Sequence, residues 1–504
     1  MRFNKVLLVN PPNPPGYVSN KDSMGGFGQL FPVGATFMPP LDLVYLASYL
    51  DAKDIPIQVL ECLGGRLDQS KGLEQAAEML SDAEESRLVI MRTSGPTLDV
   101  DIVFCTELKA RHSRIKIVLY GAIIPHVLRR LERETSIDYL IQGEPDGPAL
   151  DLILGQPEES ISGLTFRGQA GWITNPDRSL IKVLDEIPFP KWDLFPYHEY
   201  KIPRSSLRSD VRFLPMLTSR GCPVGCHYCP YPVSQGLLFR LRTPKNVVDE
   251  IEHLVKDLGI EYILFRDPIF SLNQNRVLQI CEEIKRRGLK FEWKCETRVD
   301  CLREETLRAM ASAGCVGINF GVESAEVEIQ ANSGRKPITR EQFLKTIKLC
   351  RELGIKTFGF FIVGLPGDTV DTILSTIQFS YEMQTDWVQF TAASPFIGTK
   401  LRQWAIEHGQ ASEDEYAYIN CYEGSMGNEN LTKEQVNQLT HFAQFIGAYL
   451  INRKGFLKEE RSAFWYRPAR AAVDALSLGI ARVVFHTGKW RYTRRFRPVL
   501  NAAS

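Results

Sequence analysis

Short apolar runs alternate with helix-like segments twice along this chain of 504 residues, and this alternation limits its fold more than any other feature. Strand-like runs separated by helical patterns indicate βαβ units, whose strands lie parallel. In the first series the expected strands are 5–9, 57–60, 88–92, 115–120 and 139–142. The helices expected between them are 41–50, 72–80, 100–111 and 128–134. The fold class is therefore α/β, beginning with a doubly wound, Rossmann-like domain over residues 1–154.

A second series of the same kind begins near residue 213 and predicts another domain. Its expected strands are 213–219, 260–265, 291–296, 316–321, 356–363 and 387–392. Six βα units are too few to close an eight-stranded barrel, so we expect an open, partial (β/α)6 barrel over residues 211–400. Residues 155–210 are expected to be a linker with a small hairpin, and residues 401–504 a helical C-terminal region with a basic tail.

Composition and charge exclude several classes of protein. The chain has 60 basic and 60 acidic side chains, so no net charge favours nucleic acid. No run of about 18 apolar residues indicates a transmembrane helix, and the N-terminal apolar run meets proline too soon for a signal peptide. Eleven cysteines, scattered apart from one group, are typical of a reducing cytosol. We therefore expect a cytoplasmic protein without a nucleic-acid partner.

Three cysteines make the most specific motif of the chain. Cys222, Cys226 and Cys229 have the spacing C-x3-C-x2-C and follow the first strand of the second series. Three thiolates can bind three irons of a four-iron, four-sulfur cluster and leave the fourth iron open for another ligand. A structural zinc ion would need a fourth ligand, and His227 is badly placed because it is adjacent to Cys226. An electron-transfer cluster would likewise need a fourth cysteine near by.

The segment TSRGCPVGCHYCPYP and the strand-end segments after it resemble the radical S-adenosylmethionine (SAM) superfamily, over about residues 210–400. The resemblance implies that the three cysteines hold the cluster and that SAM binds its open iron. One electron, from an external reductant such as flavodoxin or ferredoxin, would then cleave SAM to a 5′-deoxyadenosyl radical. Singly, each strand-end residue could equally belong to an ordinary turn or a surface ion pair. The implied SAM contacts are Asp267, Arg298, Glu323, Ser324, Gly364 and Pro366.

The segments KVLLVNPP, PPLDLVYLASYL and YLIQGEPD resemble the cobalamin-binding domain of one branch of this superfamily. In a doubly wound sheet the ligand crevice lies at the carboxyl ends of the strands. The candidate contacts there are Asn10, Ser94, Gly121 and Gly143. The D-x-H-x-x-G motif that gives cobalt a histidine ligand is missing, so cobalamin is expected without one. A domain that keeps this fold without the cofactor is the alternative.

The resemblance implies cobalamin-dependent methyl transfer to an unactivated carbon of a small or lipid-like substrate. Radical cyclisation or rearrangement, as in tetrapyrrole cyclases, stays open, as does a non-catalytic regulator that binds a cluster or cobalamin. The sequence assigns no catalytic residue toward the substrate.

The tail after residue 450 is strongly basic, with twelve Lys and Arg residues against three acidic ones. The segment 469–485 has the apolar spacing of an amphipathic helix. Packing of this helix on the barrel and peripheral contact with a membrane surface are both open interpretations. RNA binding is a third, although no nucleic-acid module accompanies the charge.

Overall fold

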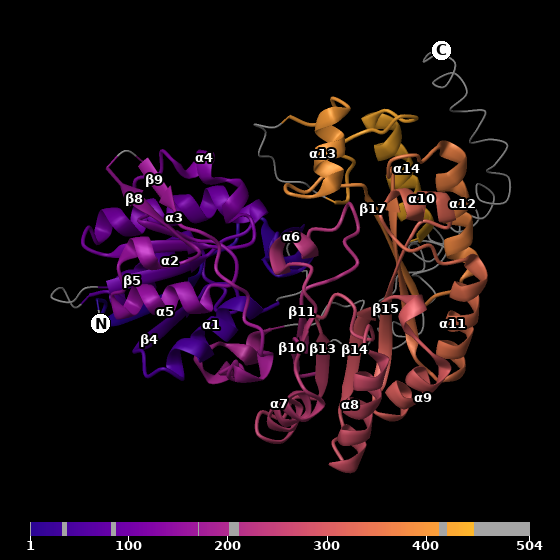
Figure 1. Ribbon diagram of the computed structural model, residues 1–504, viewed down its shortest axis with the longest axis horizontal. Helices are drawn as coiled ribbons and strands as arrows, with labels where there is room; N and C mark the ends of the chain where they lie inside the picture. Colours follow the sequence, from indigo (N-terminus) through magenta and orange to yellow (C-terminus); the bar gives the residue numbers. More distant parts are fainter. Residues whose placement is uncertain are drawn as a thin grey trace, which may run out of the picture.

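The computed structural model describes residues 2–32, 38–81, 87–169, 171–200, 211–412 and 421–447. They form two α/β units that lie side by side, an N-terminal unit in indigo and magenta and a barrel unit in pink to orange (Figure 1). None of the described helices combines the length and the apolar character that a bilayer-spanning segment requires. The expected helix at 469–485 and the basic tail lie outside the described residues.

The N-terminal unit is built on one seven-stranded sheet with the order β4-β1-β5-β6-β7-β8-β9. The first five of these strands are parallel, as predicted, and β1 lies between β4 and β5. The strands are β1 Lys5–Asn10, β4 Ile57–Glu61, β5 Arg87–Arg92, β6 Lys116–Tyr120, β7 Tyr139–Ile141, β8 Leu164–Gly168 and β9 Gly171–Thr174. The hairpin expected in the linker is therefore part of this sheet, since β8 pairs with β7 in antiparallel fashion.

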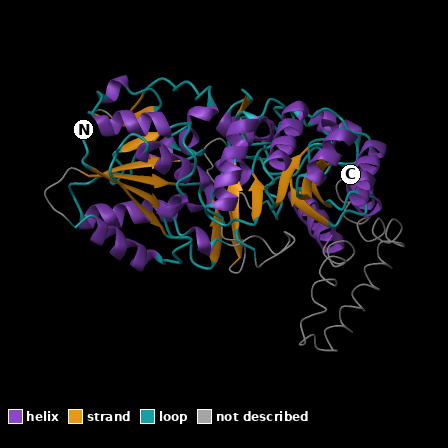
Figure 2. Ribbon diagram, turned by 90° about the horizontal axis from the view of Figure 1, so that it is seen from below, coloured by secondary structure: helices purple, strands orange, loops and turns teal. Residues whose placement is uncertain are grey.

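Helices cover both faces of this sheet, as the doubly wound interpretation requires (Figure 2). Alternate residues of β1 enter two separate apolar clusters: Val6 and Leu8 belong to one, and Leu7 and Val9 to the other. A strand that is buried on both faces explains the continuous apolar run in the sequence. The helices are α1 Leu41–Asp51, α2 Gln69–Met79, α3 Leu98–Arg111, α4 Leu128–Leu131 and α5 Asp146–Leu154.

A short hairpin that the sequence did not predict lies within the Gly/Pro-rich segment after β1. Its strands are β2 Tyr17–Asn20 and β3 Gln29–Pro32, and they pair in antiparallel fashion. The backbone N–H of Gly95 donates to the carbonyl of Phe27 at 2.8 Å, so the hairpin segment lies over the loop after β5.

The second unit is an open barrel of six parallel strands in the order β10-β13-β14-β15-β16-β17, as predicted. Most of its outer helices begin at side-chain caps; Thr243, for example, accepts from the N–H of Asn246 at the start of α7. The strands are β10 Phe213–Met216, β13 Tyr262–Phe265, β14 Glu292–Thr297, β15 Cys315–Glu323, β16 Lys356–Val363 and β17 Trp387–Ala392. The main helices are α7 Pro244–Lys256, α8 Gln274–Arg286, α9 Glu304–Ser312, α11 Arg340–Glu352 and α12 Val370–Glu382.

Smaller elements complete the barrel unit. The short elements near the cysteines are β11 Ser219–Arg220, α6 Tyr231–Gln235 and β12 Arg240–Leu241, with α10 Val327–Asn332 after β15. Beyond β17, α13 Lys400–Glu407 and α14 Lys433–Ile446 confirm the helical character of the described part of the C-terminal region. Helix α14 packs against β17.

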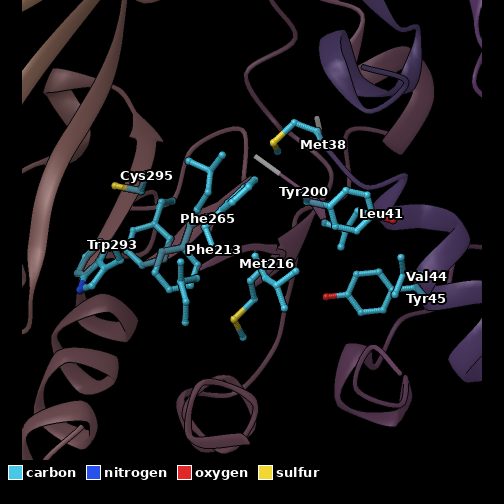
Figure 3. Close-up of a cluster of buried hydrophobic side chains, with 14 of the residues drawn as sticks. Met38, Leu41, Val44, Tyr45, Tyr200, Phe213, Met216, Phe265, Trp293 and Cys295 are labelled. Carbon is cyan, nitrogen blue, oxygen red and sulfur yellow. The ribbon is translucent and has the colours of Figure 1, made fainter. Parts of the chain in front are cut away.

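One apolar cluster runs through both units. It contains Leu41, Val44 and Tyr45 of α1 together with Phe213 and Met216 of β10. Figure 3 shows these side chains facing one another across the interface. The two units therefore share a core, which fixes the carboxyl ends of one sheet relative to those of the other.

Candidate functional site

The cysteine loop follows β11 at the carboxyl end of the barrel, where the sequence predicted it. Gly221 has a φ of +85°, and a Cβ atom there would clash with the backbone carbonyl of Leu238. Two backbone hydrogen bonds hold the loop. The N–H of Cys222 donates to the carbonyl of Gly236 at 3.1 Å, and the N–H of His227 donates to the carbonyl of Ser333 at 2.9 Å. A glycine is thus required at the point where the chain turns into the motif.

The three cysteines lie within electrostatic range of one another. Burial raises the pKa of each thiol, and the charge of Cys226 raises those of Cys222 and Cys229 further. Backbone N–H groups of Val224 and Gly225 point at Cys222 and favour its thiolate. Among the described residues no three His, Cys, Asp or Glu side chains are close enough to form a ready-made metal site. Because burial raises the pKa values of these thiols, binding of a cluster would have to remove their protons.

An arginine that the sequence analysis missed supports the predicted contact Glu323. Arg335 Nη1 donates to Glu323 Oε1 at 2.8 Å and to Tyr228 Oη at 3.0 Å, and its Nη2 donates to the carbonyl of Gly321. Tyr228 stands between the second and third cysteines, so this network joins the end of β15 to the cysteine loop. Glu323 has a φ of +66°, a conformation unusual for a residue with a side chain.

Ser324, predicted beside Glu323, is buried and shapes the turn after β15. Its hydroxyl accepts from the N–H of Glu326 at 3.2 Å and contacts the hydroxyl of Thr376 at 3.3 Å. The Ser324 hydroxyl therefore stabilises the backbone of the turn after β15.

Arg298 lies at the end of β14 and keeps one donor free. Its Nε and Nη2 bind both oxygens of Asp300 at 2.9 and 3.0 Å. Its buried Nη1 has no hydrogen-bond partner among the described residues. The positive charge of Arg298 also lowers the pKa values of Cys222 and Cys226, against the larger effect of burial. A buried guanidinium nitrogen without a partner, close enough to influence the cysteines electrostatically, can donate to a carboxylate ligand.

Asp267 is fully buried and saturated with internal hydrogen bonds. Its Oδ1 accepts from the hydroxyl of Thr218 at 2.8 Å, from the N–H of the same residue at 3.1 Å and from the hydroxyl of Ser219. Its exposed fraction is 0%. Asp267 therefore anchors the segment before the cysteines, and the direct contact with SAM that the resemblance implies stays a prediction.

A cavity of about 300 Å³ lies beside the cysteine loop and is lined by His227, Tyr228 and Pro366, among others. Gly364, predicted together with Pro366, is not in the lining. It has a φ of +86°, and a Cβ atom there would meet Val436 of α14 at 2.7 Å. Pro366 therefore borders open space, whereas Gly364 permits the close packing of α14.

A second cavity, of about 160 Å³, lies between the two units and is named here the interdomain cavity. Gly121 after β6 and Gly143 after β7 line it from the first sheet. Leu217 after β10, Arg266 after β13 and Tyr231 of α6 line it from the barrel. The carboxyl ends of both sheets, where ligands bind in α/β proteins, thus meet at one space.

Charged side chains surround the interdomain cavity in pairs. Arg92 lies 2.5 Å from Asp42, and burial together with the charge of Asp42 raises the pKa of Asp22 to about 7. Arg266 binds Glu296 at 3.0 Å. Two buried polar atoms of the lining, Tyr120 Oη and Asp146 Oδ1, have no hydrogen-bond partner among the described residues. No described residue of the lining is a histidine.

Two of the predicted contacts in the first unit do not line this cavity. Asn10 is buried and donates to Glu61 at 2.5 Å. Ser94 is buried beneath the unpredicted hairpin segment, and its hydroxyl lies 3.0 Å from that of Thr97. Asn10 and Ser94 therefore lie outside the lining of the interdomain cavity, and their predicted contact with cobalamin stays a prediction.

Comparison with known proteins agrees with this geometry. Residues 216–380 match the Radical SAM superfamily. Over 455 residues the chain is 29% identical to the uncharacterized methyltransferase PH0819 of Pyrococcus horikoshii, covering 89% of this chain and 93% of the relative. It is 24% identical to the cytidylyl-2-hydroxyethylphosphonate methyltransferase of Streptomyces wedmorensis, with coverages of 85% and 86%. It is 29% identical to the anaerobic magnesium-protoporphyrin IX monomethyl ester cyclase of Rubrivivax gelatinosus, with coverages of 69% and 62%.

The fold is similar to that of OxsB, a cobalamin-dependent SAM radical enzyme solved with aqua-cobalamin and SAM. The TM-score is 0.71 at 16% identity, and the match covers 96% of this chain and 72% of that structure. At this identity the likeness shows the fold, including the order of its two units. The match over residues 216–380, with the cysteine loop inside it, shows that this part of the chain is a radical SAM domain.

Proposed function

We propose that this protein is a cobalamin-dependent radical SAM methyltransferase acting on an unactivated carbon of a small molecule. One observation carries the proposal: the carboxyl ends of the N-terminal sheet and of the barrel meet at the interdomain cavity. Helix α6, which forms part of the cavity wall, begins two residues after Cys229. A cluster at the cysteines and a ligand of the first sheet would therefore be neighbours.

In the barrel, the residues around the cysteines have separable roles. Bound at Cys222, Cys226 and Cys229, a four-iron, four-sulfur cluster supplies the electron that cleaves SAM. The free Nη1 of Arg298 suits the SAM carboxylate, and the Glu323–Arg335 pair fixes Tyr228 beside the cluster. The cavity lined by Tyr228 and Pro366 offers an apolar and aromatic wall for the adenine. Asp267 holds the segment before the cysteines by accepting from Thr218 and Ser219.

In the N-terminal unit, the walls suit a flat and amide-rich group such as cobalamin, which supplies a methyl carrier when bound. Gly143 has no atom within 4 Å of an added Cβ, so the wall is open there. Tyr120 Oη and Asp146 Oδ1 can each satisfy an amide. The volume of about 160 Å³ is below the ~300–1,000 Å³ of ordinary ligand pockets. Because the two units share an apolar core, we infer that side chains of the cavity wall rearrange to admit the cofactor.

The relatives support methyl transfer more than the alternative. Two of them are methyltransferases that the chain matches over at least 85% of its length. Radical cyclisation is the second candidate, favoured by the similarity to the cyclase. We further propose flavodoxin or ferredoxin as the electron donor. A cytoplasmic location and membrane contact through the C-terminal tail stay predictions.

The test uses anaerobically reconstituted full-length protein with SAM and a chemical reductant. We expect about four irons per chain, release of 5′-deoxyadenosine, and loss of both when the three cysteines are changed together to alanine. Cys62→Ala, in the N-terminal unit, is the matched control and should retain both. Full iron content in the triple variant would contradict the assignment.

The cofactor is tested with hydroxocobalamin added to the same protein. We expect binding, and the reduced cofactor's electron paramagnetic resonance spectrum should lack the splitting that an axial nitrogen produces. Methyl-labelled SAM then separates the two candidate reactions, because only methyl transfer places the label in the product. Failure of cobalamin to bind would leave a cobalamin-independent radical enzyme.

A further inference from the structure

A lysine without a counter-ion lies inside the barrel, apart from the residues discussed so far. Lys294 lies in the middle of β14, opposite Gly317 of β15, and is only 4% exposed to solvent. Its Nζ lies 3.2 Å from the ring centroid of Phe358 on β16. It makes no hydrogen bond or ion pair with any described residue. Because Gly317 has no side chain, the ammonium group extends across β15 to the aromatic ring.

The neighbouring carboxylate is already engaged elsewhere. Glu296, two residues further on the same face of β14, binds Arg266 at 3.0 Å. It also accepts from Asn319 Nδ2 at 3.3 Å. This cluster of charged side chains therefore contains two cations, Lys294 and Arg266, and one anion, Glu296. Asn319 Oδ1 is buried and has no partner among the described residues.

Burial of an ammonium group without a counter-ion is unfavourable, and the face of an aromatic ring offsets only part of that cost. Burial accordingly lowers the pKa of Lys294 to about 7, although the charge of Glu296 opposes this. A bound anion would supply the charge that the described residues do not. Arg266 also lines the interdomain cavity, so the group connects to the space proposed above for the reaction.

We propose that Lys294, with Phe358 and Arg266 beside it, binds an anionic group of the substrate, a carboxylate or a phosphate, inside the barrel. This inference rests on the proposed function and adds the chemical class of its substrate. The SAM carboxylate is not the expected partner. At a rise of about 3.3 Å per residue, Lys294 lies about 13 Å along β14 from Arg298, where the cysteines are.

The experiment measures binding of inorganic phosphate and of acetate to the full-length protein by calorimetry at constant ionic strength. We expect at least one of these anions to bind the wild type tenfold more tightly than Lys294→Met. Lys245→Met is the matched control, because the side chain of Lys245 is 78% exposed on α7, and it should bind like the wild type. Phosphate alone would indicate a phosphorylated substrate, and acetate alone a carboxylate.

Thermal unfolding without added anion gives a second measurement. Methionine is close to lysine in length and carries no charge, so Lys294→Met should unfold at a higher temperature than the wild type. A lysine kept only for its contact with Phe358 would instead make this variant less stable. Equal anion binding by Lys294→Met and wild type, or a lower unfolding temperature of the variant, overturns the inference.

If Lys294→Met does not fold, Lys294→Gln replaces it in both measurements. Release of 5′-deoxyadenosine by the wild type separates the two proposals. Lys294-dependent anion binding without SAM cleavage would reject the proposed function alone. SAM cleavage with anion binding independent of Lys294 would reject this inference alone.

Discussion

At the scale of single residues, the cysteine loop depends on Gly221. The positive φ of Gly221 costs a residue with a side chain about 1–2 kcal/mol, and the clash of a Cβ atom with Leu238 adds to this. We expect Gly221→Ala to lower the iron content of reconstituted protein to less than half. Gly288→Ala is the control, since Gly288 has a φ of +65° but open space around it. It should lose about 1 kcal/mol of stability and no iron; equal iron in both variants would contradict the argument.

Lys294 should also make stability depend on pH. Its pKa is about 7 in the folded protein and 10.5 ordinarily. Above pH 10.5 the amine is neutral in both states and has no effect. As the pH falls from 10.5 toward 7, the Lys294 amine binds a proton in the unfolded chain more readily than in the folded protein. The free energy of unfolding therefore decreases over this range. Urea unfolding should show that the free energy of unfolding of Lys294→Met exceeds that of the wild type by a larger amount at pH 7 than at pH 10. A difference between the two proteins that stays constant with pH would exclude Lys294 as the cause.

At the scale of elements, the loop between β7 and α5 is tied to β11 and β12 by one carboxylate. Glu144 accepts from Arg220 at 3.1 Å and from Arg240 at 2.8 Å. Burial raises the pKa of Glu144, but these two arginines outweigh it and hold the pKa below its ordinary value. The N-terminal unit and the barrel are thus joined by an ion pair at the edge of the interdomain cavity.

We expect Glu144→Gln to reduce the free energy of unfolding by about 3 kcal/mol at pH 7, since it leaves two arginines poorly paired. Because the pKa of Glu144 is lowered on folding, its ionised carboxylate contributes fully to stability at pH values above its ordinary pKa of 4.5. This contribution is lost as the pH falls through the pKa of Glu144 in the folded protein. The difference between variant and wild type should therefore shrink at low pH. Glu107→Gln, at an exposed site on α3, serves as the control. Chemical denaturation at several pH values measures both, and an equal effect of the two variants would refute the role of Glu144.

At the scale of the whole molecule, the shared apolar cluster predicts a single cooperative unfolding transition. Leu41, Val44 and Tyr45 pack in the same cluster as Phe213 and Met216 (Figure 3), so they would be exposed if the barrel unfolded alone. Each buried side chain of this kind contributes about 1.5–3 kcal/mol, so the units should lose structure together. Differential scanning calorimetry of cofactor-free protein should show one peak whose calorimetric and van't Hoff enthalpies agree. Two separated peaks would show that the units are independent.

The sequence by itself determined both parallel sheets, the open barrel and the cysteine motif. These follow from local patterns: continuous apolar strands, capped helices, and cysteines that are close in the chain. It placed Arg298, Glu323 and Pro366 beside the cysteine loop, and Gly121 and Gly143 at the interdomain cavity. The roles of these residues toward ligands are still predictions.

Only the tertiary structure decided which strand-end residues face open space. Asp267, Asn10 and Ser94 have the residue types of a ligand site, yet residues distant in the sequence cover them: Thr218 covers Asp267, Glu61 covers Asn10, and Gly28 lies against Ser94. Arg335 and Lys294 were missed for the related reason that an isolated basic residue carries no signal in the sequence. Arg335 reaches the site across the turn after β15, and Lys294 by its register in the sheet opposite Gly317. Contacts between segments far apart in the chain depend on how the sheets pack, and local patterns do not record that packing.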